Sequence, residues 1–279
     1  MKKVLLTGPT SALSKEIRRQ LGERYQFVTI GRRDADIYWD MLQPEMLPQL
    51  PRDAAAVIHV AALVKGDALD LIETNVRASA VLYRRAAEAG VRHFIYLSSM
   101  SAAIPEGLPY HNAYGISKRS AELFLLEARH SADTALTILR PSQLYGSSSA
   151  FSKNQPLLYT MADRASRGES ITIYGSNDAL RNYVYADDLI NVLEPLLLHP
   201  LEGVFSAVCP RNYRLSEIAE AALRAFGRGG TVMFDRDKPD IPDNGFTVGN
   251  SIFEALKTDP PLNITEGMLK LRDSWVMNA

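Results

Sequence analysis

The first 150 residues alternate short apolar segments with longer amphipathic ones, and this alternation limits the folds open to the chain. The apolar segments have the length of strands and lie at residues 4–7, 27–30, 54–60, 94–98 and 136–139. Helices are predicted between them at residues 14–22, 70–90 and 113–130, the second with Gly90 as its stop signal. Short apolar strands separated by helices predict a doubly wound, parallel α/β sheet. Ligands of such sheets bind beyond the carboxyl ends of the strands, where Thr7-Gly8 and Ser99 are expected.

After residue 150 the alternation loosens and loop-forming residues become frequent. Helices are predicted at residues 156–167, 186–198, 215–226 and 264–275. We therefore expect residues 1–150 to form the sheet and residues 151–279 to form a smaller lobe that closes over it. Segments from about residues 170–210 are expected to return to the sheet.

Composition and charge exclude several classes of function. With 279 residues, 46% of them hydrophobic, the chain can bury a large core. A net charge of −1 argues against nucleic acid or an anionic membrane as the main partner. Cys209 is the only cysteine and the histidines are scattered, so neither a disulfide framework nor a metal site is predicted. Because the first apolar run is too short for a signal peptide and no stretch could span a bilayer, we expect a cytoplasmic enzyme.

Tyr114 and Lys118 lie four residues apart in a predicted helix, so their side chains share one face. A nearby cation favours the phenolate, and we therefore expect Lys118 to lower the pKa of Tyr114 from about 10 toward neutrality. A tyrosine with such a pKa exchanges a proton with a hydroxyl or carbonyl group near pH 7. Ser99, at the end of the preceding strand, can hydrogen-bond the same oxygen as charge develops on it. Because a YxxxK pair alone is more often a surface feature, the assignment depends on the motifs around it.

Further motifs precede and follow this pair in a fixed order. They are Thr7-Gly8, His59-Val60-Ala61-Ala62, Asn75, Ser98-Ser99, Arg140-Pro141-Ser142-Gln143-Leu144-Tyr145-Gly146, Ile171-Thr172-Ile173-Tyr174-Gly175 and Arg181-Asn182-Tyr183-Val184-Tyr185-Ala186-Asp187-Asp188-Leu189. In this order the sequence resembles the extended short-chain dehydrogenase/reductases, which are NAD(P)-dependent nucleotide-sugar epimerases, dehydratases and reductases. The resemblance covers nearly the whole chain. It implies a Rossmann-like dinucleotide-binding domain at residues 1–150, a substrate-binding lobe at residues 151–279, and a homodimer formed through helices 68–90 and 113–130.

The resemblance also implies a role for each motif. Tyr114 would exchange the proton at O4 of the sugar, Lys118 would hold the nicotinamide ribose, and Ser99 would bond the same sugar oxygen. Asn75 would support the lysine through water, although a buried amide that packs the helix is an alternative. The cofactor would contact Thr7, Gly8, Thr10, Ser11, Ala12, Arg32, Arg33, Asp36, Ala61, Ala62, Tyr114, Lys118 and Pro141. The substrate would contact Ser99, Ser101, Tyr145 and Arg181.

Two of these assignments have structural alternatives. Arg181 would face the nucleotide diphosphate of the substrate, or else form a surface ion pair. His59 would lie near the cofactor, or else be an imidazole bonded inside the core.

The phosphate loop departs from the family pattern TGxxGxxG. That pattern has glycines at positions 8, 11 and 14, whereas this chain has Gly8, Ser11 and Ser14. Gly8 can make the tight turn after the strand, and the hydroxyl of Ser11 can bond a phosphate. Because helix N-terminal N–H groups would still point at the anion, we expect the loop to bind dinucleotide.

The end of the second strand indicates which dinucleotide is used. Gly31 stands where an NAD enzyme places an acid for the ribose 2′-hydroxyl, and Arg32 and Arg33 follow it. Guanidinium groups suit a 2′-phosphate through charge and bidentate geometry. NADP is therefore the predicted cofactor, with NAD as the alternative; Asp36 resembles an adenine-contacting position.

Three reactions of the family compete. A dehydratase carries an acid pair directly after the catalytic serine or threonine, where this chain has Met100-Ser101. The short segment between the second and third strands and the arginines Arg32 and Arg33 favour a 4-keto-sugar reductase over a 4-epimerase by a small margin. From another class, a non-catalytic NADP-binding sensor is supported by the altered phosphate loop.

Overall fold

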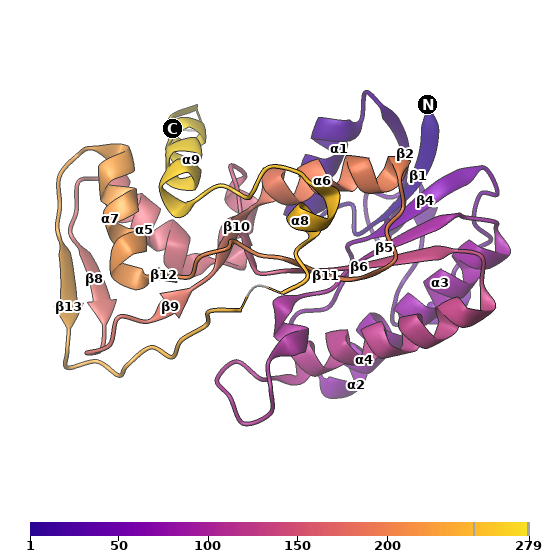
Figure 1. The fold of residues 1–279 in the computed structure, drawn as a ribbon, viewed down its shortest axis with the longest axis horizontal. Helices are drawn as coiled ribbons and strands as arrows, with labels where there is room; N and C mark the ends of the chain where they lie inside the picture. The colour runs from indigo at the N-terminus through magenta and orange to yellow at the C-terminus, as the bar shows by residue number, and fades with distance from the viewer. Residues whose placement is uncertain (248, 278–279) are drawn as a thin grey trace.

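The computed structural model describes residues 1–247 and 249–277, and a seven-stranded sheet lies at its centre (Figure 1). Across the sheet the strands are β11 (Gly203–Ala207), β6 (Ala135–Pro141), β5 (His93–Leu97), β4 (Ala54–His59), β1 (Lys2–Thr7), β2 (Tyr25–Gly31) and β3 (Ile37–Tyr38). All its neighbouring strands run parallel. The predicted doubly wound α/β sheet is therefore confirmed, and the carboxyl ends of its strands share one edge.

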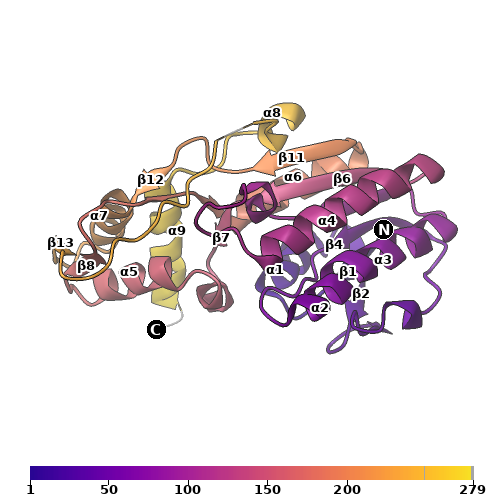
Figure 2. The same cartoon turned by 90° about the horizontal axis from the view of Figure 1, so that it is seen from below.

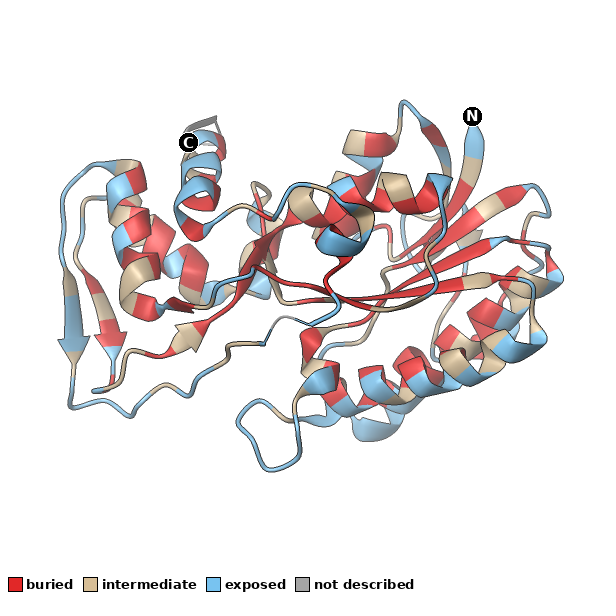
Figure 3. Cartoon of the chain, viewed as in Figure 1, coloured by how far each residue is buried: buried red, intermediate tan, exposed pale blue. Residues whose placement is uncertain are grey.

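Helices cover both faces of this sheet (Figures 1 and 2). On one face lie α1 (Ala12–Leu21) and α6 (Ala186–Leu198), and on the other α3 (Ala78–Glu88) and α4 (Ala113–Ala128). Alternate strand residues enter two separate cores: Val4 and Leu6 pack with α1 and α6, whereas Leu5 packs with α3 and α4. Burial on both faces explains why the strands read as continuous apolar runs, and the strands are mostly buried in Figure 3.

The long helix predicted at residues 70–90 is present, but it is not α-helical throughout. It begins as α2 (Ala68–Leu71), continues through a π-helical segment (Ile72–Arg77) and ends with α3, after which Gly90 adopts a φ of +80°. The predicted helix is therefore present from residue 68 to residue 88, and a π-helical segment interrupts its α-helical hydrogen bonding. A π-helical turn is wider than an α-helical one and is found mostly at functional sites.

The second half of the chain forms a smaller lobe beside the sheet (Figure 2). Its helices are α5 (Pro156–Ser166), α7 (Leu215–Phe226) and α9 (Ile264–Met277), whereas α8 (Ile252–Leu256) packs against α6 and β11 of the large sheet (Figures 1 and 2). Short strand pairs accompany them: β7 (Gln143–Tyr145) with β10 (Tyr183–Tyr185), β8 (Ile171–Tyr174) with β13 (Val232–Asp235), and β9 (Leu180–Arg181) with β12 (Tyr213–Arg214). From this half, β11 and α6 return to the large sheet. Across the described residues, every helix is too short or too polar to cross a lipid bilayer.

Candidate functional site

Ser99 and Tyr114 meet beyond the carboxyl end of β5, with their hydroxyl groups close enough for Ser99 to act on the pKa of the phenol. Ser99 caps the short 3₁₀ helix that follows the strand, since its Oγ accepts from the backbone N–H of Ser101 at 3.1 Å. Tyr114 lies in the first turn of α4, which Asn112 caps by accepting from the N–H of Gly115 at 3.0 Å. Two capped helix ends therefore fix the two hydroxyls relative to each other.

Gly115 permits this meeting, and the sequence reasoning missed it. A Cβ at this position would lie 2.5 Å from the carbonyl oxygen of Ser101, closer than such atoms pack. A larger residue would push α4, and Tyr114 with it, away from Ser99. The signal available in the sequence was a glycine inside a predicted helix, which costs about 1 kcal/mol relative to alanine and calls for a packing reason.

Lys118 lies one turn after Tyr114 and is almost fully buried. Its ammonium donates to the carbonyl oxygen of Leu97 at 2.6 Å and lies 4.3 Å from the centre of the Tyr96 ring. Burial lowers the pKa of Lys118 to about 7, and the charge of Glu122 partly opposes that shift. The Leu97 carbonyl and the aromatic ring also favour the ammonium form.

The expected lowering of the Tyr114 pKa by Lys118 is wrong for this structure. Burial raises the pKa of Tyr114 to about 12, and the hydrogen bond from Ser99 offsets only part of the rise. The cause is desolvation, which disfavours the phenolate; Lys118, whose own pKa is lowered to about 7, is neutral at the pH where the phenol titrates. At neutral pH Tyr114 is consequently a protonated phenol, suited to donate a proton rather than to accept one.

A buried ion pair lies one helical turn beyond Lys118. Glu122 on α4 accepts from Nε of Arg140 on β6 at 2.8 Å and is paired with a second nitrogen of the same guanidinium. It also accepts from the hydroxyl of Ser98 at 2.5 Å. This pair, which the sequence reasoning did not select, joins α4 to the ends of β5 and β6. The available signal was the spacing of Glu122, four residues after Lys118.

Asn75 lies in the π-helical segment and is buried. Its amide accepts from the N–H of Leu63 and donates to the carbonyl of Leu63, both at 2.8 Å, and donates to Ser117 Oγ at 2.9 Å. Ser117 in turn donates to the carbonyl of Tyr114 at 2.8 Å. Of the two predictions for Asn75, these contacts match the packing amide: it ties the loop after β4 to the helix that carries Tyr114.

His59 is buried in the core at the end of β4. The hydroxyl of Thr7 accepts from the N–H groups of Val60 and Ala61, so its own proton must go to Nδ1 of His59, 2.7 Å away. Nε2 is then the protonated nitrogen and donates to Ser79 Oγ at 3.0 Å. Burial lowers the pKa of His59 to about 3, which keeps the ring neutral. The core alternative for His59 is the one observed, and the Thr7 hydroxyl is directed inward.

The phosphate loop lies between Gly8 and α1. Gly8 has a φ of +68°, and a Cβ there would lie 3.1 Å from Cα of Ala61, so the two loops approach as closely as a glycine allows. Ser11 caps α1 by accepting from the N–H of Ser14 at 3.1 Å, and Ser14 Oγ donates to the carbonyl of Thr7 at 3.2 Å. The serines thus bond one another and the strand. The tight turn and the N-terminus of a ten-residue helix fit a dinucleotide pyrophosphate.

The remaining predicted cofactor residues flank this loop. Thr10 is exposed, whereas Ala12, Ala61 and Ala62 are half-buried around the loop. Pro141 is buried at the end of β6, opposite Ala207 of β11.

The end of β2 explains why position 31 is a glycine. A Cβ at Gly31 would lie 2.9 Å from Cδ of Pro9, so the proline ring of the phosphate loop fills the space of any side chain. Arg32 is 63% exposed and 3.9 Å from Asp40, and Arg33 is exposed. Both guanidinium groups are therefore accessible to a ligand.

Asp36 is directed back to β2 rather than left free. Its carboxylate accepts from the N–H of Thr29 at 2.8 Å and from the Thr29 hydroxyl at 2.7 Å, and these bonds lower its pKa. The carboxylate therefore fastens the turn after β2, and no adenine contact is required to explain it.

Tyr145 lies in the core, in contrast to its predicted role at the substrate. It is 1% exposed, and its ring meets those of Tyr183 and Tyr185 edge-on at 5.9 and 5.2 Å. A Cβ at Gly267 of α9 would overlap its hydroxyl at 1.6 Å, so α9 packs directly on it. The lobe covers Tyr145, which a sequence motif could not reveal. Ser101, the other predicted contact, is half-buried beside Ser99.

Arg181 on β9 is 4% exposed and is not a surface ion pair. One nitrogen donates to the carbonyls of Leu180 and Pro242 at 2.7 and 2.8 Å, and another donates to the hydroxyl of Tyr110 at 3.0 Å. All three partners are neutral oxygens. Within the described residues, no carboxylate lies within 4.0 Å of this guanidinium.

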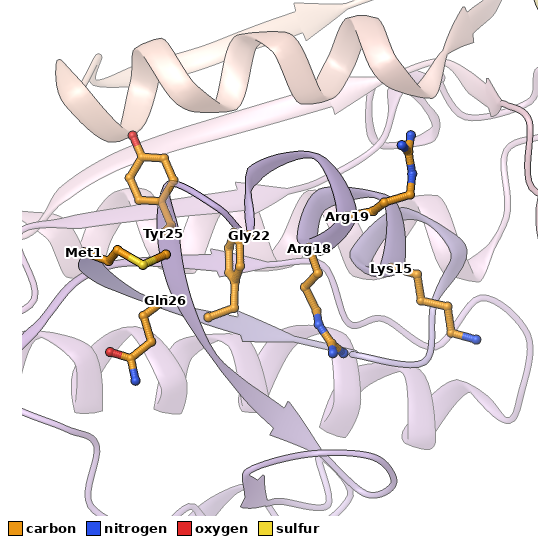
Figure 4. Close-up of a pocket in the computed structure, with 8 residues that line it drawn as sticks. Met1, Lys15, Arg18, Arg19, Gly22, Tyr25 and Gln26 are labelled. Carbon is orange, nitrogen blue, oxygen red and sulfur yellow. The ribbon is translucent and has the colours of Figure 1, made fainter.

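Two hollows on the surface lie apart from these residues. One, of about 900 Å³, lies beside α1 and β2 and is lined by Lys15, Arg18, Arg19, Tyr25 and Gln26, among others (Figure 4). The other, of about 1120 Å³, lies along α3. Neither is lined by a residue of the Ser99, Tyr114 and Lys118 set, so the chemistry of the site, rather than the size of a hollow, identifies it.

Residues 4–207 match the family model described as the NAD dependent epimerase/dehydratase family. A probable GDP-L-fucose synthase from Drosophila melanogaster is 25% identical over 86% of this chain and 86% of its own length. Among solved structures, a UDP-N-acetylglucosamine 4-epimerase from Bacillus cereus superposes with a TM-score of 0.80 at 19% identity, covering 100% of this chain and 97% of that one. RMD from Pseudomonas aeruginosa, solved in complex with NADPH, has a TM-score of 0.80 at 18% identity and full coverage of both chains.

Proposed function

Because the chain belongs to the NAD dependent epimerase/dehydratase family of enzymes acting on nucleotide sugars, we propose that it reduces the 4-keto group of a nucleotide-linked sugar. The observation that carries this proposal is the nearness of the Ser99 and Tyr114 hydroxyl groups, with Lys118 one turn beyond on the same helix. The direction of proton transfer agrees with it. With its pKa raised to about 12, Tyr114 carries a proton at neutral pH and can donate it to a carbonyl oxygen.

In the proposed reduction each of these residues would have a separate role. Tyr114 donates its proton to the sugar oxygen at C4, and Ser99 hydrogen-bonds the same oxygen as negative charge develops on it. Lys118 supplies positive charge near these two hydroxyl groups. Its hydrogen bond to the carbonyl of Leu97 also holds α4 against the end of β5. The bound dinucleotide supplies a hydride to C4. Arg181 binds the diphosphate of the substrate, since an anion would compensate a buried cation that has only neutral partners.

The cofactor proposed is NADP. Gly8 and the N-terminus of α1 would hold the pyrophosphate, and the exposed Arg32 and Arg33 would bind the 2′-phosphate. Both arginines directly follow the carboxyl end of β2 in the short connection to β3, where the adenosine would lie in this proposal. The solved structure of RMD with NADPH has the same overall fold, which supports the fit of a dinucleotide here but not which dinucleotide is used.

A dehydratase is less well supported, because Met100 and Ser101 stand where an acid pair would follow the catalytic serine. A 4-epimerase retaining NAD is the second candidate, and the fold is compatible with it. Mass spectrometry of small molecules released from freshly purified protein separates the two. Retained NAD would favour the epimerase, whereas exchangeable NADPH together with turnover of a 4-keto sugar would favour the reductase. NADP(H) binding without turnover of any nucleotide sugar would instead support the non-catalytic NADP-binding sensor.

We also propose a homodimer formed through the helices on one face. Apolar side chains on α2, the π-helical segment and α4 are at least half exposed: Leu69, Ile72, Ile116, Leu123 and Phe124. The helices α2 and α4 pack against each other, so these side chains form one apolar surface. A second copy of the chain would cover it.

A further inference from the structure

The three hydrogen-bond partners of Arg181 are not equivalent. The carbonyls of Leu180 and Pro242 belong to the main chain, one at the residue directly before Arg181 and the other in the segment after β13. The third partner, the hydroxyl of Tyr110, belongs to the loop between the 3₁₀ helix Met100–Ala103, which Ser99 caps, and the start of α4. Tyr110 also places its ring 5.5 Å from the guanidinium carbon. Its side chain therefore contacts Arg181 through both its hydroxyl and its ring.

Tyr110 is held in an unfavourable backbone conformation. Its φ is +67°, a region that side chains other than glycine, asparagine and aspartate rarely enter. The residue is 38% exposed, and its hydroxyl makes only a long contact of 3.3 Å to the carbonyl of Pro242 besides the bond from Arg181. Such strain persists only where local contacts hold it, and here the contact with Arg181 is the strongest of them.

We propose that Tyr110 is a gate over Arg181, displaced when the diphosphate of a nucleotide sugar binds. The inference rests on the proposed function, because it takes the ligand of Arg181 to be the substrate diphosphate. A phosphate oxygen carries full negative charge and forms a stronger bond with a guanidinium than a phenol oxygen does. Binding therefore replaces the Tyr110 hydroxyl on the same nitrogen and releases the strained backbone.

The same loop leads directly to the catalytic helix. Two residues after Tyr110, Asn112 caps α4, and Tyr114 follows in its first turn. Displacing Tyr110 would thus act on the cap that positions Tyr114. Occupation of the diphosphate site is in this way coupled to the geometry of the proton donor.

The test measures anion binding rather than turnover, and NADPH is present at saturation throughout so that the phosphate loop and the exposed arginines Arg32 and Arg33 are already occupied. Tyr110→Phe removes the competing oxygen but keeps the ring, so it should bind inorganic pyrophosphate about tenfold more tightly than the wild type by calorimetry. Tyr174→Phe, a change at an exposed tyrosine on β8, is the matched control and should bind as the wild type does. Arg181→Met should bind no pyrophosphate. Equal or weaker binding by Tyr110→Phe would overturn the gate. A hydroxyl that competes with the anion for Arg181 must weaken anion binding, so its removal must tighten that binding.

A second measurement needs no variant. Amide hydrogen exchange in residues 104–112 of the wild type should become faster when pyrophosphate or UDP is added, and slower or unchanged exchange would contradict displacement. The gate and the proposed function can fail separately. If Arg181→Met abolishes UDP binding while Tyr110→Phe leaves it unchanged, the diphosphate site stands and the gate is wrong. If Tyr110→Phe tightens pyrophosphate binding but no nucleotide sugar is turned over, the gate stands and the proposed function is wrong.

Discussion

The ammonium of Lys118 donates a hydrogen bond to the carbonyl oxygen of Leu97 at 2.6 Å, at the end of the strand that leads to Ser99. The cation is thereby fixed to the sheet, and the phenol of Tyr114 keeps its proton in a buried setting. The protonated phenol favours proton donation by Tyr114 over proton abstraction. In the proposed reaction the positive charge of Lys118 would stabilise the negative charge that develops on the sugar oxygen.

Removing the phenol hydroxyl should abolish most of the catalysis. Tyr114→Phe keeps the ring and its packing, so kcat should fall by about 10²–10⁴-fold while affinity for NADPH changes little. The measurement is steady-state kinetics with NADPH and a nucleotide-linked 4-keto sugar, with Tyr174→Phe as the control. Full activity in Tyr114→Phe would remove Tyr114 from the mechanism.

The rate should depend on the protonation of Lys118. Because burial lowers its pKa to about 7, its positive charge is present below that pH and is lost as the pH rises through it. We expect kcat/KM, which reports on the free enzyme, to fall above about pH 7. Lys118→Arg keeps its charge throughout, so the fall should disappear from its profile even if its maximal rate is low. A wild-type profile that stays level to about pH 9.5 would rule out this role.

Acid should destabilise the fold through His59. Its pKa is about 3 in the folded protein and about 6.5 in the unfolded chain, so the unfolded chain binds the additional proton between these values. The free energy of unfolding should therefore fall as the pH drops below 6.5, by up to about 1.4 kcal/mol per pH unit for this group. His93, with a pKa lowered to about 4 by burial, contributes with the same sign.

Denaturant unfolding of His59→Gln across this range isolates the contribution. Glutamine can hydrogen-bond but does not titrate, so the slope of stability against pH should be smaller by about one proton. His130→Gln alters an exposed histidine and should leave the slope unchanged. An unchanged slope in His59→Gln would show that the ring is charged in the folded protein.

Cofactor preference should depend on Arg32 and Arg33. Replacing both with alanine should weaken NADPH binding by ten- to a hundredfold or more and leave NADH binding nearly as before, because charge-assisted hydrogen bonds to the 2′-phosphate are lost. Arg84→Ala, at an exposed arginine on α3, serves as the control for loss of positive charge. Calorimetric or fluorescence titration distinguishes the outcomes, and equal weakening for both dinucleotides would assign the arginines to the adenosine.

Gly31→Asp should not act as a simple switch to NAD, because Pro9 occupies the space of the new side chain at 2.9 Å. Alone, it should weaken both dinucleotides by distorting the phosphate loop. Combined with Pro9→Ala, it should favour NADH, since the carboxylate can then accept from the ribose 2′-hydroxyl. A single Gly31→Asp variant that binds NADH well would mean that the proline ring yields easily.

The proposed dimer should depend on Phe124, which is 61% exposed on α4. A lysine at this position would bring a charge into the apolar interface, so Phe124→Lys should sediment as a monomer at micromolar concentrations where the wild type is a dimer. Met233→Lys, a comparable change on β13, should leave the wild-type mass unchanged. A monomeric wild type would remove the proposal.

Local patterns were enough to predict most of the architecture. The strands of the parallel sheet, the two helices at residues 186–198 and 215–226, and the family follow from apolar periodicity and from motifs in order, because burial on both faces dictates continuous apolar strands. The nearness of Ser99 to Tyr114 was likewise predictable, since both follow from where a strand ends and a helix begins. None of this required knowledge of the packing between elements.

The contacts between secondary-structure elements, and the burial and pKa values that depend on them, were decided only by the tertiary structure. The pKa of Tyr114 rises because α4 is packed against the 3₁₀ turn after β5, and desolvation depends on the whole surrounding shell. Gly31 is a glycine because of a proline ring 22 positions earlier in the chain, and the side chain of Tyr145 is covered by α9. Arg181 is buried under Tyr110, 71 residues away in sequence. Steric exclusion and desolvation act between residues far apart in the chain, so no local pattern records them.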